Sequence, residues 1–95
     1  MNKIKELGKD IYFDEGFINM LGYEWMYRYQ RPEALEIFKL NVEAFPKSSN
    51  AYDGLGEAYM NKGDTNNAII NYKKSLELNP ENNNAVEKLK VLEKQ

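Results

Sequence analysis

The sequence predicts an all-α fold, an antiparallel stack of helix hairpins, and three observations lead to this prediction. The chain repeats its landmark residues at an offset of 34 residues, without a gap. Within each unit, apolar residues recur at the three- and four-residue spacings of one helix face. Prolines and glycines fall between these segments, where helices end. Neither hairpin can bury its apolar face alone, so we expect the two units to stack.

Each landmark of the first unit has a counterpart in the second. The pairs are Leu21–Gly22 and Leu55–Gly56, Trp25 and Tyr59, Ala34 and Ala68, Phe38 and Tyr72, and Pro46 and Pro80. Good helix N-caps stand before each unit and before the segment that follows them, at Asp14, Ser48 and Asn82. We therefore divide the chain into an N-terminal helix or linker (1–14), repeat 1 (15–48), repeat 2 (49–82) and a C-terminal capping helix (83–95).

The small residues of each unit predict a close crossing of its two helices. Gly22 and Gly56 lack side chains on the first helices, at a cost of about 1 kcal/mol in helix propensity. We expect Ala34 and Ala68 to be their small partners on the second helices. Large aromatic side chains around each crossing would supply the buried apolar area.

These motifs resemble the tetratricopeptide repeat family, whose pattern is W-x2-L-G-x2-Y, then A-x3-F, then P, in 34 residues. The matching stretches are INMLGYEW, ALEIF and P in the first unit, and YDGLGEAY, AIINY and P in the second. Asn41 and Ser75 depart from the pattern, because the family usually has Ala there. Tyr29 stands where the second unit has Gly63, so the first loop (Gln30-Arg31) should be tighter or differently shaped. The resemblance implies an α-solenoid that binds proteins and does not catalyse a reaction.

The two ends of the chain lie outside the complete repeats. Residues 83–95 begin a third first helix, with Val86 and Leu89 in register, and their lysines and glutamates suit a polar cap. Ile4, Leu7 and Ile11 form a helical stripe. This stripe is either a short N-terminal cap helix or the second helix of a preceding repeat.

A longer stretch, from Phe38 to Pro80, resembles the repeat-containing tails that follow the catalytic domains of some bacterial serine hydrolases, beta-lactamase-like proteins and esterases. Two expectations for the cellular location follow. A free-standing module would be cytoplasmic, and a fragment of such a hydrolase would lie in the envelope or be secreted.

Composition weighs against several functional classes. The chain has no Cys and no His, so the commonest general base, metal ligands and thiol nucleophile are missing. We expect no catalytic residues, cofactor or metal. The net charge of −2, with both signs spread along the chain, argues against nucleic acid. No apolar run approaches the ~20 residues that cross a bilayer, so we expect no membrane segment.

The candidate binding residues lie on the first helix of each unit, opposite the packing stripe. Aromatic side chains anchor a bound peptide, methionines adapt to it, and acidic groups favour basic partners. The candidates are Asn19, Met20, Tyr23, Met26, Tyr27, Asp53, Glu57 and Met60. The alternative is that Tyr23 and Tyr27 pack against the N-terminal segment or a second copy.

A grip on a partner's C-terminal carboxylate is not expected, because the positions that would provide it hold Asn19, Tyr23, Gly54 and Lys88. Asp53 and Glu57 are interpreted as a solvated pair four residues apart. Two functions stay open: a module that binds a peptide or dimerises, and an accessory domain of a larger bacterial hydrolase. In both, the partner is a protein or peptide, and it could be the parent chain or a second copy.

Overall fold

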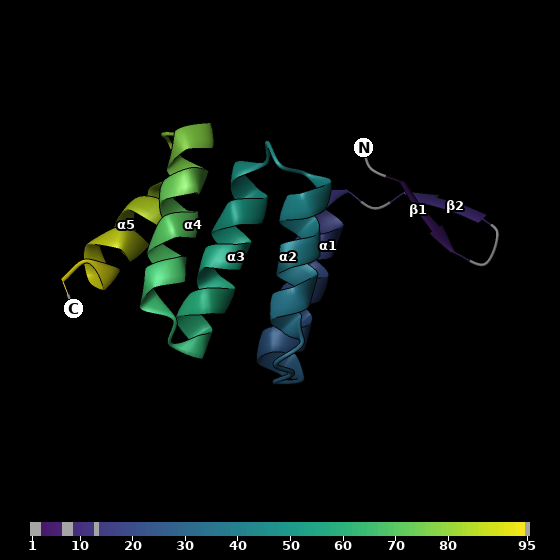
Figure 1. Cartoon of the computed structure of the whole chain (residues 1–95), viewed down its shortest axis with the longest axis horizontal. Helices are drawn as coiled ribbons and strands as arrows, with labels where there is room; N and C mark the ends of the chain where they lie inside the picture. The colour runs from purple at the N-terminus through teal and green to yellow at the C-terminus, as the bar shows by residue number, and fades with distance from the viewer. Residues whose placement is uncertain (1–2, 7–8, 13, 95) are drawn as a thin grey trace.

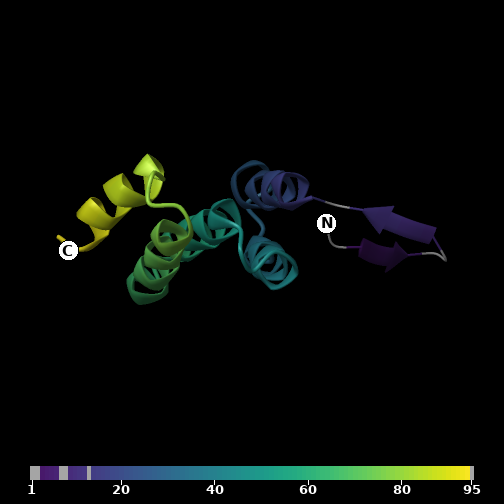
Figure 2. The same cartoon turned by 90° about the horizontal axis from the view of Figure 1, so that it is seen from above.

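In the computed structural model, the described residues form a β-hairpin followed by five α-helices (Figure 1), and a π-helical segment continues the first of these helices. The structure describes the backbone of residues 3–6, 9–12 and 14–94 and the side chains of residues 14–94. The elements are β1 (Lys3–Glu6), β2 (Lys9–Tyr12), α1 (Glu15–Tyr23), η1 (Glu24–Arg28), α2 (Ala34–Ala44), α3 (Ser49–Lys62), α4 (Thr65–Leu78) and α5 (Asn83–Leu92). Seen from above, α1 and α5 lie along one side of the stack, and α2 and α4 along the other (Figure 2). The predicted stack of helix hairpins is confirmed.

The predicted N-cap residues do cap their helices. The side chains of Asp14, Ser48 and Asn82 accept hydrogen bonds from the backbone N–H three residues further on. Asp64 does the same for α4 and accepts two hydrogen bonds from Asn67, one from the backbone and one from the side chain. These bonds lower the pKa of the Asp64 carboxyl below its usual value. Each cap fixes where a helix begins, because it satisfies a backbone donor that has no partner within the helix.

The N-terminal segment is not the helix that the Ile4, Leu7 and Ile11 spacing predicted. β1 and β2 pair antiparallel, with Ile4 opposite Ile11 and Lys3 opposite Tyr12. The sequence from Lys3 to Tyr12 also fits a hairpin. Ile and Tyr favour strands, and Gly8 weakens a helix. Leu7, which completed the helical stripe, lies outside the described residues.

The turn between the two helices differs between the units, as the sequence predicted. α3 ends at Gly63, which adopts the left-handed conformation with φ +83°. The first unit has no glycine there. Its first helix instead widens into the π-helix η1, and Gln30 takes φ +50°. A π-helix bonds five residues back rather than four, so it rotates the last side chains of this helix relative to a regular α-helix.

Each close helix crossing is between a glycine and an aromatic ring, not between the glycine and the alanine that we expected. A Cβ on Gly22 would lie 2.6 Å from Cζ of Phe38, and one on Gly56 would lie 3.1 Å from the Tyr72 ring. Gly54, which lies on α3 in the second repeat, also contacts Phe38. A Cβ added to Gly54 would lie 2.8 Å from the Phe38 ring. The Phe38 ring therefore fits between two glycine backbones, and it is fully buried.

The polar residues that replace alanine in the second helices donate hydrogen bonds to backbone oxygens at the start of the first helices. Asn41 Nδ2 donates to the backbone oxygen of Glu15, at 3.1 Å. Ser75 Oγ donates to the backbone oxygen of Ser49, at 2.8 Å. Glu15 and Ser49 are equivalent positions, as are Asn41 and Ser75. The same polar contact thus closes both hairpins and satisfies the Asn41 amide N–H group and the Ser75 hydroxyl, whereas Asn41 Oδ1 has no hydrogen-bond partner among the described residues.

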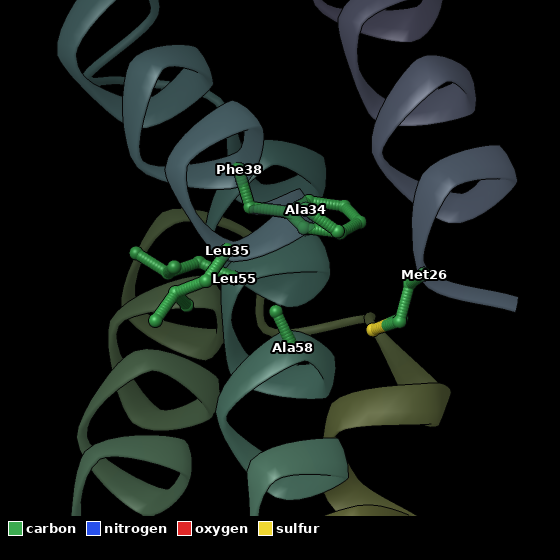
Figure 3. Packing of buried hydrophobic residues seen from close by; sticks show 6 residues of the cluster. All are labelled: Met26, Ala34, Leu35, Phe38, Leu55 and Ala58. Atoms are coloured by element: carbon green, nitrogen blue, oxygen red, sulfur yellow. The ribbon is translucent and has the colours of Figure 1, made fainter. Parts of the chain in front are cut away.

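The apolar core forms two clusters that repeat along the stack. The first consists of Met26, Ala34, Leu35, Phe38, Leu55 and Ala58 (Figure 3). The second consists of Ala68, Tyr72, Ala85, Leu89 and Leu92. In each cluster, the first helix of the following repeat covers the hairpin before it. α5 therefore closes the second cluster and acts as the expected C-terminal cap.

Candidate peptide-binding surface

Two stacked tyrosines connect the first repeat to the second. Tyr23, at the end of α1, and Tyr27, on η1, have nearly parallel rings whose centroids are 6.3 Å apart. The Tyr27 hydroxyl donates a hydrogen bond to the Glu57 carboxylate on α3. The Tyr27 ring nevertheless stays 53% exposed. We call the surface formed by Met20, Tyr23, Tyr27, Glu57 and Asn61 the first-helix face.

The environment of this face raises the pKa of both phenols, so they stay protonated well into the alkaline range. Partial burial, followed by the hydrogen bond to Glu57, raises the pKa of Tyr27 to about 12. Burial first, and then the charges of Glu57 and Asp53, also raise the pKa of Tyr23. At neutral pH each hydroxyl can therefore donate a hydrogen bond, and the charge of this part of the face comes from Glu57.

Tyr23 contributes to the core as well as to the surface. Its ring meets Phe38 edge to face, with 5.1 Å between centroids and 71° between planes. It is half-buried and packs against the first core cluster. Tyr27 is therefore the more accessible anchor of the pair, and Tyr23 stacks against it on the side of the core.

Asn19 and Asp53 are not groove residues, contrary to the sequence-based expectation. Asn19 is only 4% exposed, and its Nδ2 donates to the backbone oxygen of Asn50, at 3.0 Å. Asp53 is 7% exposed and accepts from Asn82 and Asn84, at 2.7 and 2.8 Å. Both residues join their repeat to the next one. Asp53 is thus not half of a solvated pair with Glu57, because the following repeat covers it.

The candidate methionines divide in a similar way. Met20 is 52% exposed and remains on the first-helix face. Met26 is a correction, because it lies in the first core cluster with 9% exposure. Met60 is half-buried and packs against the second cluster. Of the predicted candidates, Met20, Tyr23, Tyr27 and Glu57 remain together on one accessible face.

Sequence reasoning missed a hollow at the edge of this face. It has a volume of about 450 Å³ and opens between the first turn and the end of α3. Its lining comprises Met26, Tyr27, Gln30, Arg31, Pro32, Ala34, Leu35, Ala58, Asn61 and Lys62. The sequence contained a signal for this hollow. Ala58 on α3 is equivalent to the larger Leu92 on α5, which is the first helix of the third, incomplete unit.

Asp14 has the structural role that the sequence predicted. Asp14 caps α1, and its Oδ1 accepts from the Phe17 N–H at 2.8 Å. Among the described residues, no group of three or more acidic side chains is arranged to hold a metal ion. None of the helices described here is long and apolar enough to span a bilayer.

The helical stack and the comparisons with known proteins point to the same class. Residues 49–82 match the family model of the tetratricopeptide repeat. Residues of this chain are 49% identical over 43 positions to cellulose synthase operon protein C of Escherichia coli K12, covering 45% of this chain. They are 31% identical over 64 positions to superkiller complex protein 3 of Mus musculus, covering 67% of this chain. In both cases the match spans only 4% of the relative's length.

Residues 49–82 thus match a tetratricopeptide repeat, and the stack of helix hairpins has the arrangement that this resemblance predicts. Repeats of this family generally mediate protein–protein interactions and are typically not catalytic. The two relatives do not support the expected likeness to the tails of bacterial hydrolases. The specific role of this chain is therefore inferred from its surface.

Proposed function

We propose that this chain is a protein-interaction module that docks a polypeptide segment on its first-helix face, with Tyr27 as the main anchor. The observation that carries the proposal is that the exposed Tyr27 ring is held in place from two sides, by Tyr23 below and Glu57 beside it. A ring that is already fixed loses little conformational entropy on binding, and such aromatic side chains often dominate interface energies.

The charge of the face indicates the chemistry of the segment. Glu57 is the acidic group that remains accessible beside Tyr27, because Asp53 is buried against the following repeat. A basic or aromatic-apolar segment suits this surface better than an acidic one. A carboxylate grip is disfavoured further, since Asn19 is buried and Gly54 is packed against Phe38.

The alternative, an accessory domain of a larger bacterial hydrolase, would use the same face toward its own catalytic domain. No observation favours a hydrolase over another parent protein. Docking between proteins is common to both possibilities, and the test below addresses it directly.

The test is a peptide selection followed by measurement with a matched pair of variants. Peptides selected from a random display library by the full chain are titrated against Tyr27→Ala and Tyr29→Ala. These two tyrosines are 53% and 55% exposed, but the Tyr29 ring lies against Arg28, 5.6 Å from its guanidinium, and not on the first-helix face. We expect Tyr27→Ala to lose about 1–3 kcal/mol of binding and Tyr29→Ala to keep wild-type affinity. Equal losses, or none, would contradict the proposal.

A further inference from the structure

The hollow beside Tyr27 has an apolar floor and a polar, positively charged rim. The floor consists of Met26, Ala34, Leu35 and Ala58, which are all buried. The rim residues Arg31 and Lys62 are exposed, and Gln30 and Asn61 complete it. An apolar floor with a few convergent polar groups is the usual composition of a ligand site, and 450 Å³ falls in the usual size range.

The chain itself shows what fills the corresponding place one repeat further on. Shifting the floor by 34 residues gives Met60, Ala68, Ile69 and Leu92. There Leu92 is 4% exposed in a cluster with Ala68, and Met60 and Ile69 pack against it. A leucine side chain from the next first helix therefore occupies the space that stays open beside Ala58.

Two local features keep the first hollow open. The side chain of Ala58 has three fewer heavy atoms than that of leucine, and Figure 3 shows Met26 pointing from η1 toward this short side chain. The π-helical turn and the left-handed Gln30 shape the other wall. The space is thus a property of this turn and of one small residue.

We propose that this hollow receives an apolar side chain of leucine size from a bound polypeptide, with an acidic residue next to it in the partner's sequence. The inference extends the proposed function, because the hollow shares Tyr27 with the first-helix face. Its lining contains Arg31 and Lys62 and not Glu57, so the charge preference at the hollow is opposite to that beside Glu57. The leucine size follows from Leu92, and the acidic neighbour follows from the rim. Lys62 is exposed. Arg31 pairs with the exposed Glu33, at 3.6 Å, and its guanidinium also lies 5.8 Å from the centroid of the Trp25 ring. An exposed pair of this kind is weak and can be exchanged for a partner's carboxylate.

The test uses blocked tripeptides and the NMR signals of the Met26 and Ala58 methyl groups in the full chain. Acetyl-Asp-Leu-Asp-amide should shift both signals saturably, with a dissociation constant in the millimolar range. Acetyl-Asp-Ala-Asp-amide should bind about tenfold more weakly or worse, because it lacks the apolar group. Acetyl-Asn-Leu-Asn-amide should bind a few-fold more weakly, and this difference should shrink as salt is added.

Two variants test the location of the bound side chain. Ala58→Leu introduces the residue found at the equivalent position 92, so it should fold, occupy the floor of the hollow beside Met26 and abolish the tripeptide shifts. Lys62→Gln should weaken acetyl-Asp-Leu-Asp-amide a few-fold, whereas the matched Lys47→Gln should not. Should Ala58→Leu fail to fold, the comparison of Lys62→Gln with Lys47→Gln and the tripeptide series still test whether the leucine side chain binds in the hollow.

The results also separate this inference from the proposed function. Loss of tripeptide binding in Ala58→Leu, with Tyr27-dependent binding of the selected peptides retained, supports the hollow as a distinct subsite. Three results would overturn it: no methyl shift with any tripeptide, equal binding of the leucine and alanine tripeptides, or methyl shifts that depend on protein concentration alone. The last would identify a second copy of the chain as the occupant.

Discussion

The Phe38 ring lies directly on the backbone of Gly22, where an added Cβ would be 2.6 Å from Cζ. The ring cannot move away, because Gly54 of the next repeat confines it from the other side. At the equivalent crossing, a Cβ on Gly56 would lie 3.1 Å from Tyr72, a contact that a small adjustment can relieve. The two crossings therefore have different tolerance for a side chain.

Gly22→Ala should destabilise the chain by about 1–3 kcal/mol, because a methyl group forces the buried ring to shift. Gly56→Ala should cost much less, because its contact at 3.1 Å is milder and the gain of about 1 kcal/mol in helix propensity, which both changes share, can offset it. Thermal or urea unfolding of the two variants measures the difference. If Gly56→Ala were the more harmful change, the packing described at these crossings would be wrong.

The surroundings of Tyr72 predict that its replacement by Phe stabilises the chain. Its ring is fully buried, and its hydroxyl has no hydrogen-bond partner among the described residues. Because an unsatisfied buried hydroxyl is costly, Tyr72→Phe should raise the stability by about 1 kcal/mol, or about 4–8 °C in Tm. The reverse change at the equivalent position, Phe38→Tyr, places a hydroxyl against the Gly22 backbone and should lower Tm. A lower Tm for Tyr72→Phe would show that its hydroxyl is satisfied, for example by water.

Tyr27 predicts a pH dependence at the alkaline end. Its pKa is raised to about 12, above the ordinary value of 10.0. The stability that this shift contributes is therefore complete below about pH 10 and is lost as the pH rises toward about 12. Absorbance of ionised tyrosine, compared between wild type and Tyr27→Phe, measures this pKa. Glu57→Gln should lower it only in part, because burial is the larger cause. A pKa near 10 in the wild type would contradict the contact with Glu57.

Replacing Tyr23 or Tyr27 by Ala should have different effects on the free energy of unfolding. Tyr23→Ala removes a half-buried ring that meets Phe38 edge to face, so it should cost about 1–3 kcal/mol of stability. Tyr27→Ala removes an exposed ring and should change the stability by less than about 1 kcal/mol. Urea unfolding gives both values. Equal destabilisation by the two changes would mean that Tyr27 is a core residue and that the binding surface lies elsewhere.

The sequence predicted those parts of the fold that are local or repeated. Caps such as Asp14 and Ser48 act within three residues, and the 34-residue offset defines the hairpins without any knowledge of contacts. The N-terminal hairpin was missed because Ile4 and Ile11 fit a helical stripe and also face each other across a strand pair. Spacing alone cannot choose between these two arrangements.

The candidate site was predicted less well, because it depends on contacts between repeats. Helical rotation placed Asn19 and Asp53 on an open face, yet Asn50 and Asn84 of the following repeats cover them. Met26 lies in the first core cluster, and the equivalent Met60 of the regular helix α3 also packs against a core cluster, so packing between repeats covers this position in both units. Tyr27 and Glu57 were found correctly as accessible residues, but their hydrogen bond was not foreseen.

The most direct test of the central claim is to map where a selected peptide binds, by backbone amide NMR shifts of the full chain. The proposal places the largest changes at residues 23–27 and 57–61, at the end of α1, on η1 and on the facing part of α3. Leu40 on α2 and Ile70 on α4 are exposed apolar residues away from this face, 50% and 61% exposed, and their surroundings should not change. The largest shifts around Leu40 and Ile70, with none at Tyr27, would contradict docking on the first-helix face.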